Sequence, residues 1–327
     1  MTNHIIFGGS GFTGRYLCEA LSQRGAQTIL CDIKAPDFAL PAGSRFIKVD
    51  LTDAQSLAEI PVANDDFVYN LAARQFHDSV PTKNQDAWFG EVNVRGTANL
   101  LDWMQKHSLS RLVALSTDMV YGIPQQVPVP PSHIRNPLGP YGRSKLRAED
   151  LCKEARKNGM QVTILRPRMI VGPGRLGVLV KLFSLMEKNL PVPMIGNGRN
   201  HYQMISVHDV VSAILASLDA GFPNVELNLG SHNPPSVRAL LEKSIHQANS
   251  RSHVWATPGL PLKWLLSILE KIGHPLLHKE QYSIADLNYL VDIGPTTKAL
   301  GWSPQYSDID MLYQAYEEYR ATRIKKD

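Results

Sequence analysis

The chain has 327 residues, of which 43% are hydrophobic and 20% charged, and 34 basic against 30 acidic residues give a formal net charge of +4. This is the composition of a globular protein with a large core, and it excludes a collagen-like or low-complexity chain. The charges are interspersed, and the basic stretch at residues 323–326 is too short to indicate a nucleic-acid partner.

No apolar run approaches the roughly 20 residues that a membrane span needs, and no basic region precedes the first apolar segment as in a signal peptide. Cys18, Cys31 and Cys152 have neither metal-ligand spacing nor a C-x-x-C pattern. No pair of histidines has ligand spacing with a carboxylate, so we expect no metal site. The sequence therefore predicts a cytoplasmic protein with reduced, mostly buried thiols and no membrane span.

Up to about residue 170, short β-type runs alternate with helical stretches. The predicted strands cover residues 4–7, 28–31, 46–49, 67–70, 112–116 and 162–165. The predicted helices cover residues 13–24, 53–59, 86–106 and 141–158. Several strands are apolar throughout, as expected for strands covered on both faces. The alternation predicts an α/β fold, a doubly wound parallel sheet of the Rossmann type, over residues 1–172.

After Gly172 the alternation ends and the pattern becomes mostly helical. The predicted helices cover residues 178–187, 208–219, 236–247, 261–272 and 308–320. We expect residues 173–327 to form a smaller substrate-binding region over the carboxyl edge of the sheet, with some segments returning to the sheet.

The segment "FGGSGFTG" lies between the first strand and the first helix and fits two glycine fingerprints. Gly9, Gly11 and Gly14 fit G-x-G-x-x-G, whereas Gly8, Gly11 and Gly14 fit G-x-x-G-x-x-G. Either pattern lets the backbone and a helix N-terminus approach a pyrophosphate. Asp32 ends the next strand, 18 residues after Gly14, where a carboxylate accepts the ribose hydroxyls. A carboxylate there repels a 2′-phosphate, so the sequence favours NAD over NADP.

Two further segments follow predicted strands. Asp50 and Leu51 suit adenine recognition, although Asp50 is also a good N-cap for the helix after it, and both interpretations can hold. Ser116 and Thr117 end a strand at the edge where α/β sheets bind ligands.

Tyr141 and Lys145 lie four residues apart at the start of a predicted helix and so share one face. A tyrosine has an ordinary pKa of about 10, and we expect the lysine ammonium together with a cationic nicotinamide to lower it. The tyrosinate can then take an alcohol proton as a hydride leaves the carbon, while Thr117 holds the substrate oxygen. This interpretation depends on the whole combination, because Tyr-x-x-x-Lys alone is common on amphipathic helices.

With these residues placed, the chain resembles an extended short-chain dehydrogenase/reductase of the NAD-dependent epimerase/dehydratase type. The matching segments are "GGSGFTG", "VDLTD", "VYNLAA", "VNVRGTANLL", "LSTDMVYG", "YGRSK", "LRPRMIVGPG", "ISVHDVVSAI" and "TKALGWSP". They cover almost the whole chain and are specific to the superfamily more than to a substrate.

The resemblance implies NAD as the cofactor, and roles for individual positions. It favours Gly8, Gly11 and Gly14 as the working glycine triplet, and makes Asn93 a structural residue. The implied catalytic residues are Thr117, Tyr141 and Lys145. The implied cofactor-binding residues are Gly8, Gly11, Phe12, Thr13, Gly14, Asp32, Asp50, Leu51, Leu71, Ala72, Ala73, Ser116, Tyr141, Lys145 and Pro167. It also implies a homodimer in which helices 86–106 and 141–158 form a four-helix bundle.

Three departures from the family pattern bear on the substrate. Met119 stands where dehydratases carry a glutamate, Met169 where sugar-nucleotide enzymes carry an asparagine, and Tyr202 where they carry a phosphate-binding arginine. An arginine nearby can substitute, because a planar guanidinium binds phosphate in a bidentate manner. The candidate substrate contacts are Asp118, Met119, Arg168, Met169, Arg175, Arg199 and Tyr202.

Three functions stay open from the sequence. The first is a nucleotide-sugar enzyme of the 4-epimerase kind. In such an enzyme a ring carbinol is oxidised, the ketose rotates in the site, and hydride returns to its opposite face. The second is a dehydrogenase of a bulky, less polar alcohol or ketone, similar to 3β-hydroxysteroid dehydrogenases. The apolar segment at residues 261–277 favours this function. The third is a non-catalytic NAD-sensing protein, against which the intact Thr117, Tyr141 and Lys145 set argues.

Overall fold

A seven-stranded parallel sheet forms the centre of the protein, which we describe from a computed structural model covering residues 2–76, 80–177, 179–271, 273 and 276–324. The strand order is β10-β6-β5-β4-β1-β2-β3, and every pair is parallel. The strands are β1 (Asn3–Phe7), β2 (Gln27–Asp32), β3 (Ser44–Lys48), β4 (Phe67–Asn70), β5 (Arg111–Leu115), β6 (Gln161–Pro167) and β10 (Glu226–Leu229). The doubly wound sheet predicted from the sequence is thereby confirmed.

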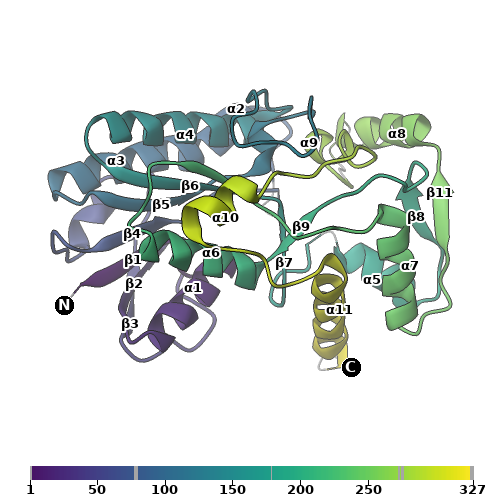
Figure 1. Ribbon diagram of the computed structural model, residues 1–327, viewed down its shortest axis with the longest axis horizontal. Helices are drawn as coiled ribbons and strands as arrows, with labels where there is room; N and C mark the ends of the chain where they lie inside the picture. The colour runs from purple at the N-terminus through teal and green to yellow at the C-terminus, as the bar shows by residue number, and fades with distance from the viewer. Residues whose placement is uncertain (1, 77–79, 178, 272, 274–275, 325–327) are drawn as a thin grey trace.

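Helices cover both faces of this sheet (Figure 1). α1 (Phe12–Gln23) and α6 (Val207–Asp219) lie on one face, and α3 (Thr97–Lys106) and α4 (Pro140–Lys157) on the other. The strands alternate between the two, since Ile5 packs into the core beside α3 and α4 while Ile6 packs into the core beside α1 and α6. Burial of both faces explains why the strands are apolar throughout.

The chain beyond residue 172 forms most of the part drawn on the right of Figure 1. Its strands are β8 (Val192–Ile195) paired with β11 (Val254–Thr257), and β9 (Met204–Ser206), which pairs with β7 (Met169–Val171) just before residue 172. Its helices are α5 (Leu179–Glu187), α7 (Val237–Gln247), α8 (Gly259–Lys271), α9 (Lys279–Tyr282), α10 (Gly294–Leu300) and α11 (Asp308–Ile324). Two of the later segments, α6 and β10, pack on or join the central sheet. The division into two regions at residue 172 stays a prediction.

Two predicted helices differ from the structure. Only a 3₁₀ turn, η1 (Ser56–Glu59), stands where residues 53–59 were expected to be helical. The Asp50 and Asp53 side chains accept backbone N–H groups two residues on, and the Ser56 hydroxyl donates to both their carbonyls. These local bonds compete with a regular helix.

The predicted helix at residues 86–106 is three segments: α2 (Gln85–Gly90), a π-helical segment η2 (Glu91–Gly96), and α3. The ends of the predicted helices at residues 178 and 272 lie outside the described residues, as do residues 325–327 of the basic tail. All three cysteines are free and buried. Within the described ranges, no helix has the length and apolarity to cross a bilayer.

Candidate active site

The glycine-rich turn after β1 is shaped by two close backbone approaches. Gly8 has a φ of +78°, which favours glycine, and its N–H donates to the Cys31 carbonyl at 2.9 Å. A Cβ on Gly14 would lie 2.3 Å from the Gly8 carbonyl oxygen, so α1 packs on the turn only without a side chain there. Gly9 presses on β2 in the same way, with Leu30 Cβ at 2.8 Å from its ideal Cβ position.

Gly11 differs from these three glycines because it is exposed. A Cβ there would meet only the Gly8 carbonyl oxygen, at 3.1 Å, and no side chain caps the N-terminus of α1 that Gly11 begins. The open backbone at residues 11–13 leaves room and N–H donors for a pyrophosphate. The turn therefore fits the dinucleotide that its sequence predicts.

Asp32 lies at the carboxyl end of β2 against this turn. Its carboxylate accepts the Ser10 N–H at 3.2 Å and the Lys34 N–H at 3.5 Å, and burial raises its pKa. Asp50 is exposed, and its carboxylate accepts both the N–H and the hydroxyl of Thr52 at 2.8 Å. The helix that Asp50 was expected to cap is absent, so the N-cap interpretation is not met and the carboxylate instead forms a local turn with Thr52.

The other expected cofactor contacts lie along the same edge of the sheet. Leu51 is buried beneath the π-helical segment, with its Cβ at 3.1 Å from an ideal Cβ on Gly96. Residues 71–73 follow β4, and the Ala72 nitrogen lies 2.7 Å from an ideal Cβ on Gly8. Pro167 ends β6. The ends of β1, β2, β4, β5 and β6 lie along one edge of the parallel sheet, and the cofactor contacts there stay a prediction.

Thr117 and Tyr141 come together from β5 and α4. Both are buried, at 7% and 5% exposure, and the Thr117 side chain is one of the groups that act to lower the pKa of Tyr141. Thr117 Oγ1 also accepts the Met119 N–H at 3.2 Å and donates to Asp118 Oδ1 at 3.4 Å. The pair is arranged as a hydroxyl that can hold a substrate oxygen beside a phenol that can exchange its proton.

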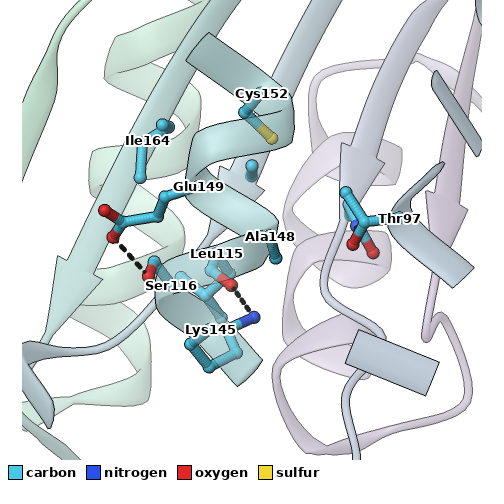
Figure 2. A pocket seen from close by; sticks show the side chains of 10 residues that line it. Thr97, Leu115, Ser116, Lys145, Ala148, Glu149, Cys152 and Ile164 are labelled. Carbon is cyan, nitrogen blue, oxygen red and sulfur yellow. Dashed lines mark hydrogen bonds between the residues drawn. The ribbon is translucent and has the colours of Figure 1, made fainter. Parts of the chain in front are cut away.

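Lys145 faces a small pocket between α4 and the neighbouring strands, where Nζ donates to the Leu115 carbonyl at 2.7 Å (Figure 2). Burial lowers the pKa of Lys145 to about 8. Burial likewise raises the pKa of Tyr141, and the largest opposing charge is that of Arg175. Lys145 is not among the groups that act most on the Tyr141 pKa, and its joint effect with a bound nicotinamide stays a prediction.

A buried polar network that sequence reasoning missed supports the strand end. Glu149, one turn after Lys145, accepts the Ser116 hydroxyl at 2.6 Å and a bidentate pair of bonds from Arg166 at 2.8 and 2.7 Å. Burial acts to raise the pKa of Glu149, but Arg166 outweighs it and the pKa lies below its ordinary range. Arg166 also donates to the Tyr121 hydroxyl at 2.8 Å. Ser116 therefore bonds to the protein's interior, and Figure 2 shows its hydroxyl directed at Glu149.

The candidate substrate residues separate into different environments. Arg168 is 2% exposed, pairs with Asp118, and lies over the rings of Tyr202 and Tyr289 at 4.5 and 4.0 Å. Tyr289 donates its hydroxyl to the Asp118 carbonyl at 3.0 Å. The charge of Asp118 is therefore balanced by a buried cation beside the catalytic hydroxyls.

The remaining candidates are placed nearer to solvent. Arg175 is half-buried, donates to Gln75 Oε1 at 2.5 Å, and lies 5.8 Å from the Phe12 ring centroid. Met169, in β7, is also half-buried, whereas Arg199 is exposed in a turn. Of the three arginines, Arg175 is the one whose charge acts on Tyr141 and which also contacts the glycine-rich turn.

The N-terminus of α4 receives an unexpected partner from 139 residues away. The Glu280 carboxylate, on α9, accepts the Tyr141 N–H at 3.0 Å and the Gly142 N–H at 2.9 Å. It is 4% exposed, and burial raises its pKa to about 6. No local sequence pattern could reveal a partner at this separation.

Asn93 lies in the π-helical segment and ties three parts of the site together. Its side chain accepts the Arg74 N–H at 2.8 Å, donates to the Arg74 carbonyl at 3.1 Å, and donates to the Ser144 hydroxyl at 2.9 Å. It therefore fixes the loop after β4 against α4, a role that agrees with the structural one implied by the resemblance.

Comparison with known proteins gives a family match over residues 4–230, to the NAD dependent epimerase/dehydratase family. The protein y4nG of Sinorhizobium fredii is 31% identical over 324 residues, which cover 98% of this chain and 79% of that protein. A putative UDP-glucose 4-epimerase of Methanocaldococcus jannaschii is 29% identical, with 76% and 83% covered. The solved UDP-glucose 4-epimerase of Thermotoga maritima superposes with a TM-score of 0.80 at 23% identity, covering 98% and 100%, and this last likeness concerns the fold.

Proposed function

The chain belongs to the NAD-dependent epimerase/dehydratase family and is an NAD-dependent enzyme, and from that premise we propose that it is a 4-epimerase of a nucleotide sugar. The observation that carries the proposal is the burial of Thr117 and Tyr141, whose side chains interact at the carboxyl end of β5. The relatives that bear the name UDP-glucose 4-epimerase support the substrate class.

The protein's residues have distinct parts in the proposed reaction. Residues 11–13 and Asp32 would hold the pyrophosphate and the adenosine ribose, and Lys145 would bind the nicotinamide ribose. When bound, NAD would supply a reversible hydride acceptor for the sugar carbon. Tyr141 takes the hydroxyl proton as the carbon–hydrogen bond breaks and gives it back on the return, while Thr117 holds the oxygen. No net oxidation results, because the ketose is consumed within the same site.

The electrostatics explain why Tyr141 needs help from its ligands. Burial holds its pKa above the ordinary value, and Glu280 and Asp118 add negative charge nearby. Arg175 opposes them, and the positive nicotinamide ring adds to Arg175. The tyrosinate therefore becomes accessible when the cofactor is in place.

Dehydration is disfavoured by two neighbouring positions. An elimination needs an acid and a base beside the sugar carbon, but Asp118 is held by Arg168 and the next residue is Met119. The same pair removes Arg168 as a phosphate-binding residue, and Arg199 is exposed in a turn. We therefore assign the diphosphate to Arg175, near the glycine-rich turn.

The test combines activity with the state of the cofactor. The purified protein should release NAD on denaturation. It should interconvert UDP-glucose and UDP-galactose without a net change in absorbance at 340 nm, which reports NADH. Tyr141→Phe should lower turnover by about 10²- to 10⁴-fold, the range for general acid–base groups, with NAD content unchanged. Tyr313→Phe, at an exposed tyrosine of α11, is the matched control and should behave as wild type. Full turnover by Tyr141→Phe refutes the mechanism.

A second candidate is an oxidoreductase of a bulky apolar alcohol, and an exposed apolar face favours it. Leu260 and Trp264 of α8 are 83% and 70% exposed, on a helix that packs against α9. Stoichiometric NADH formation from a sterol-like alcohol, without action on UDP-sugars, would replace the epimerase by this function. A non-catalytic NAD sensor is disfavoured, because the chain matches an NAD dependent epimerase/dehydratase family.

A homodimer in the cytoplasm, formed through residues 86–106 (α2, η2 and α3) and through α4, completes the proposal. The outward face of α4 carries Arg143, Arg147 and Asp150, all exposed. A dimer held there relies on polar contacts, so sedimentation should show a dimer that weakens in high salt. A monomer at every salt concentration contradicts it.

A further inference from the structure

The helix that carries Tyr141 lacks a cap in its own sequence. α4 begins after Gly139, which has no side chain to accept the first N–H groups. Helices ordinarily satisfy these donors with serine, threonine, aspartate or asparagine at this position. The Tyr141 and Gly142 N–H groups are buried, so leaving them without acceptors is unfavourable.

Glu280 fills the place that the local sequence leaves open. Its two carboxylate oxygens accept one N–H each, from Tyr141 and Gly142. Room for the carboxylate depends on the absent side chains, since a Cβ on Gly139 would lie 2.4 Å from Oε1 and one on Gly142 would lie 3.1 Å from Oε2. Gly139 has extended backbone angles, φ −154° and ψ −173°, so a steric reason and not a conformational one requires glycine there.

We propose that Glu280 is a positioning residue of the active site, whose carboxylate holds the first turn of α4 so that the Tyr141 hydroxyl stays against Thr117. This inference rests on the proposed function. It goes beyond that function because the residue touches neither cofactor nor substrate and acts through the backbone of α4.

The surroundings of Glu280 make a purely stabilising role a poor explanation. Met119, Leu138, Ile284 and Tyr289 line a small pocket with it, so its charge is held in mainly apolar surroundings. A buried carboxylate without a close cation is unfavourable for folding. The arrangement keeps the anion at a helix N-terminus, the end of a helix that favours negative charge.

The charged groups that face Glu280 come from two helices. Arg143 of α4 acts to lower its pKa and Asp86 of α2 to raise it, and these two pair with each other at 2.8 Å. Tyr289 and Tyr141 are the other titratable groups around it. Among the described residues, none of these groups donates a side-chain hydrogen bond to Glu280. Protonation of Glu280 therefore acts on its two bonds to the α4 backbone.

The position of Glu280 is itself set from α8. Glu270 accepts the Lys279 N–H at 3.1 Å and lies 3.3 Å from His278 Nδ1, at the start of α9. The C-terminal region thus reaches the first turn of the catalytic helix through this short segment, and the order of that segment governs the first turn of α4.

The test uses full-length Glu280→Gln and Glu280→Asp, with Glu242→Gln as control. Glutamine keeps one acceptor and removes the charge, and aspartate keeps the charge but withdraws it by one methylene. Glu242 is an exposed carboxylate paired with Arg238 on α7, so its change is chemically the same. Hydrogen exchange at the Tyr141 and Gly142 amides, kcat and KM for UDP-glucose between pH 5 and 8, and NAD content are measured for each.

We expect faster exchange at both amides in Glu280→Gln and a kcat lower by about 10- to 100-fold, the loss that a displaced catalytic group causes. KM and NAD content should stay within about threefold. Wild-type kcat should fall as the pH drops below 6, where Glu280 takes up its proton, and this step should be absent from Glu280→Gln. Glu280→Asp should recover the pH step but not the full kcat.

The inference is overturned if amide exchange at Tyr141 and Gly142 is unchanged in Glu280→Gln. It is also overturned if this variant has the same kcat as wild type between pH 5 and 8. If wild type shows no turnover of any nucleotide sugar, the proposed function fails instead, and the amide exchange still decides whether Glu280 holds the helix. If Glu280→Gln does not fold, Glu280→Asp gives the same two measurements.

Discussion

Neutralising Glu280 should make the protein slower, and should make its stability relative to wild type increase as the pH rises. Burial raises the pKa of this carboxyl from its ordinary 4.5 to about 6. At about 1.4 kcal/mol per pH unit, this rise corresponds to roughly 2 kcal/mol of unfolding free energy. Because the pKa is raised in the folded state, the stabilisation is complete below pH 4.5 and is lost as the pH rises through 6. Glu280→Gln has no such group to titrate.

The assay is urea unfolding of wild type and Glu280→Gln at pH 4.5 and pH 8. The difference between the two proteins should change by about 2 kcal/mol in favour of the variant as the pH rises, which for a chain of this size is several degrees in Tm. The loss of a hydrogen bond in Glu280→Gln changes its unfolding free energy equally at both pH values, so it does not affect the change between them. The buried His4, whose pKa burial lowers to about 4, titrates in both proteins and therefore also cancels. A difference that does not vary with pH, or that moves in favour of wild type as the pH rises, refutes the electrostatic reasoning.

Two further predictions concern the cofactor site. Gly14→Ala forces a Cβ to within 2.3 Å of the Gly8 carbonyl and should cost about 1–3 kcal/mol in urea unfolding and at least tenfold in NAD affinity. Gly90→Ala is its control, since no atom lies within 4 Å of the new Cβ, and a similar loss there would mean that the close contact is not the cause. Asp32→Ala should reduce the NAD-to-NADP preference in kcat/KM by about tenfold or more. An unchanged preference would remove Asp32 from the ribose site.

The sheet could be predicted because its pattern is local. Each strand is a short apolar run, each crossover helix follows within a few residues, and the glycine turn marks the first junction. β10 was not recognised, since a four-residue strand after a turn looks like a loop until β6 pairs with it. The helix expected at residues 53–59 was wrong because Asp50, Asp53 and Ser56 use their side chains in local turns.

The candidate site was predictable to the extent that its members lie in motifs. Thr117 and Tyr141 were found and do meet. The ion pairs around them could not be predicted. The sequence suggests Arg168 as a possible phosphate ligand, but the fold places its guanidinium against Asp118. Partners of this kind are brought together from distant positions, so spacing along the chain gives no sign of them.

The π-helical segment at residues 91–96 sets the two halves of a long helix out of phase with each other. Its wider turn holds one more residue than an α-turn, so the helix before it is rotated by about 100° relative to a regular continuation. Upstream, the Trp88 ring lies 5.0 Å from the Arg74 guanidinium and Phe89 lies 5.7 Å from Tyr141. Downstream, α3 presents Leu100 and Met104 to the core. A chain one residue shorter here could keep one of these alignments but not both, so the length of this segment is as much a part of the site as the residues in it.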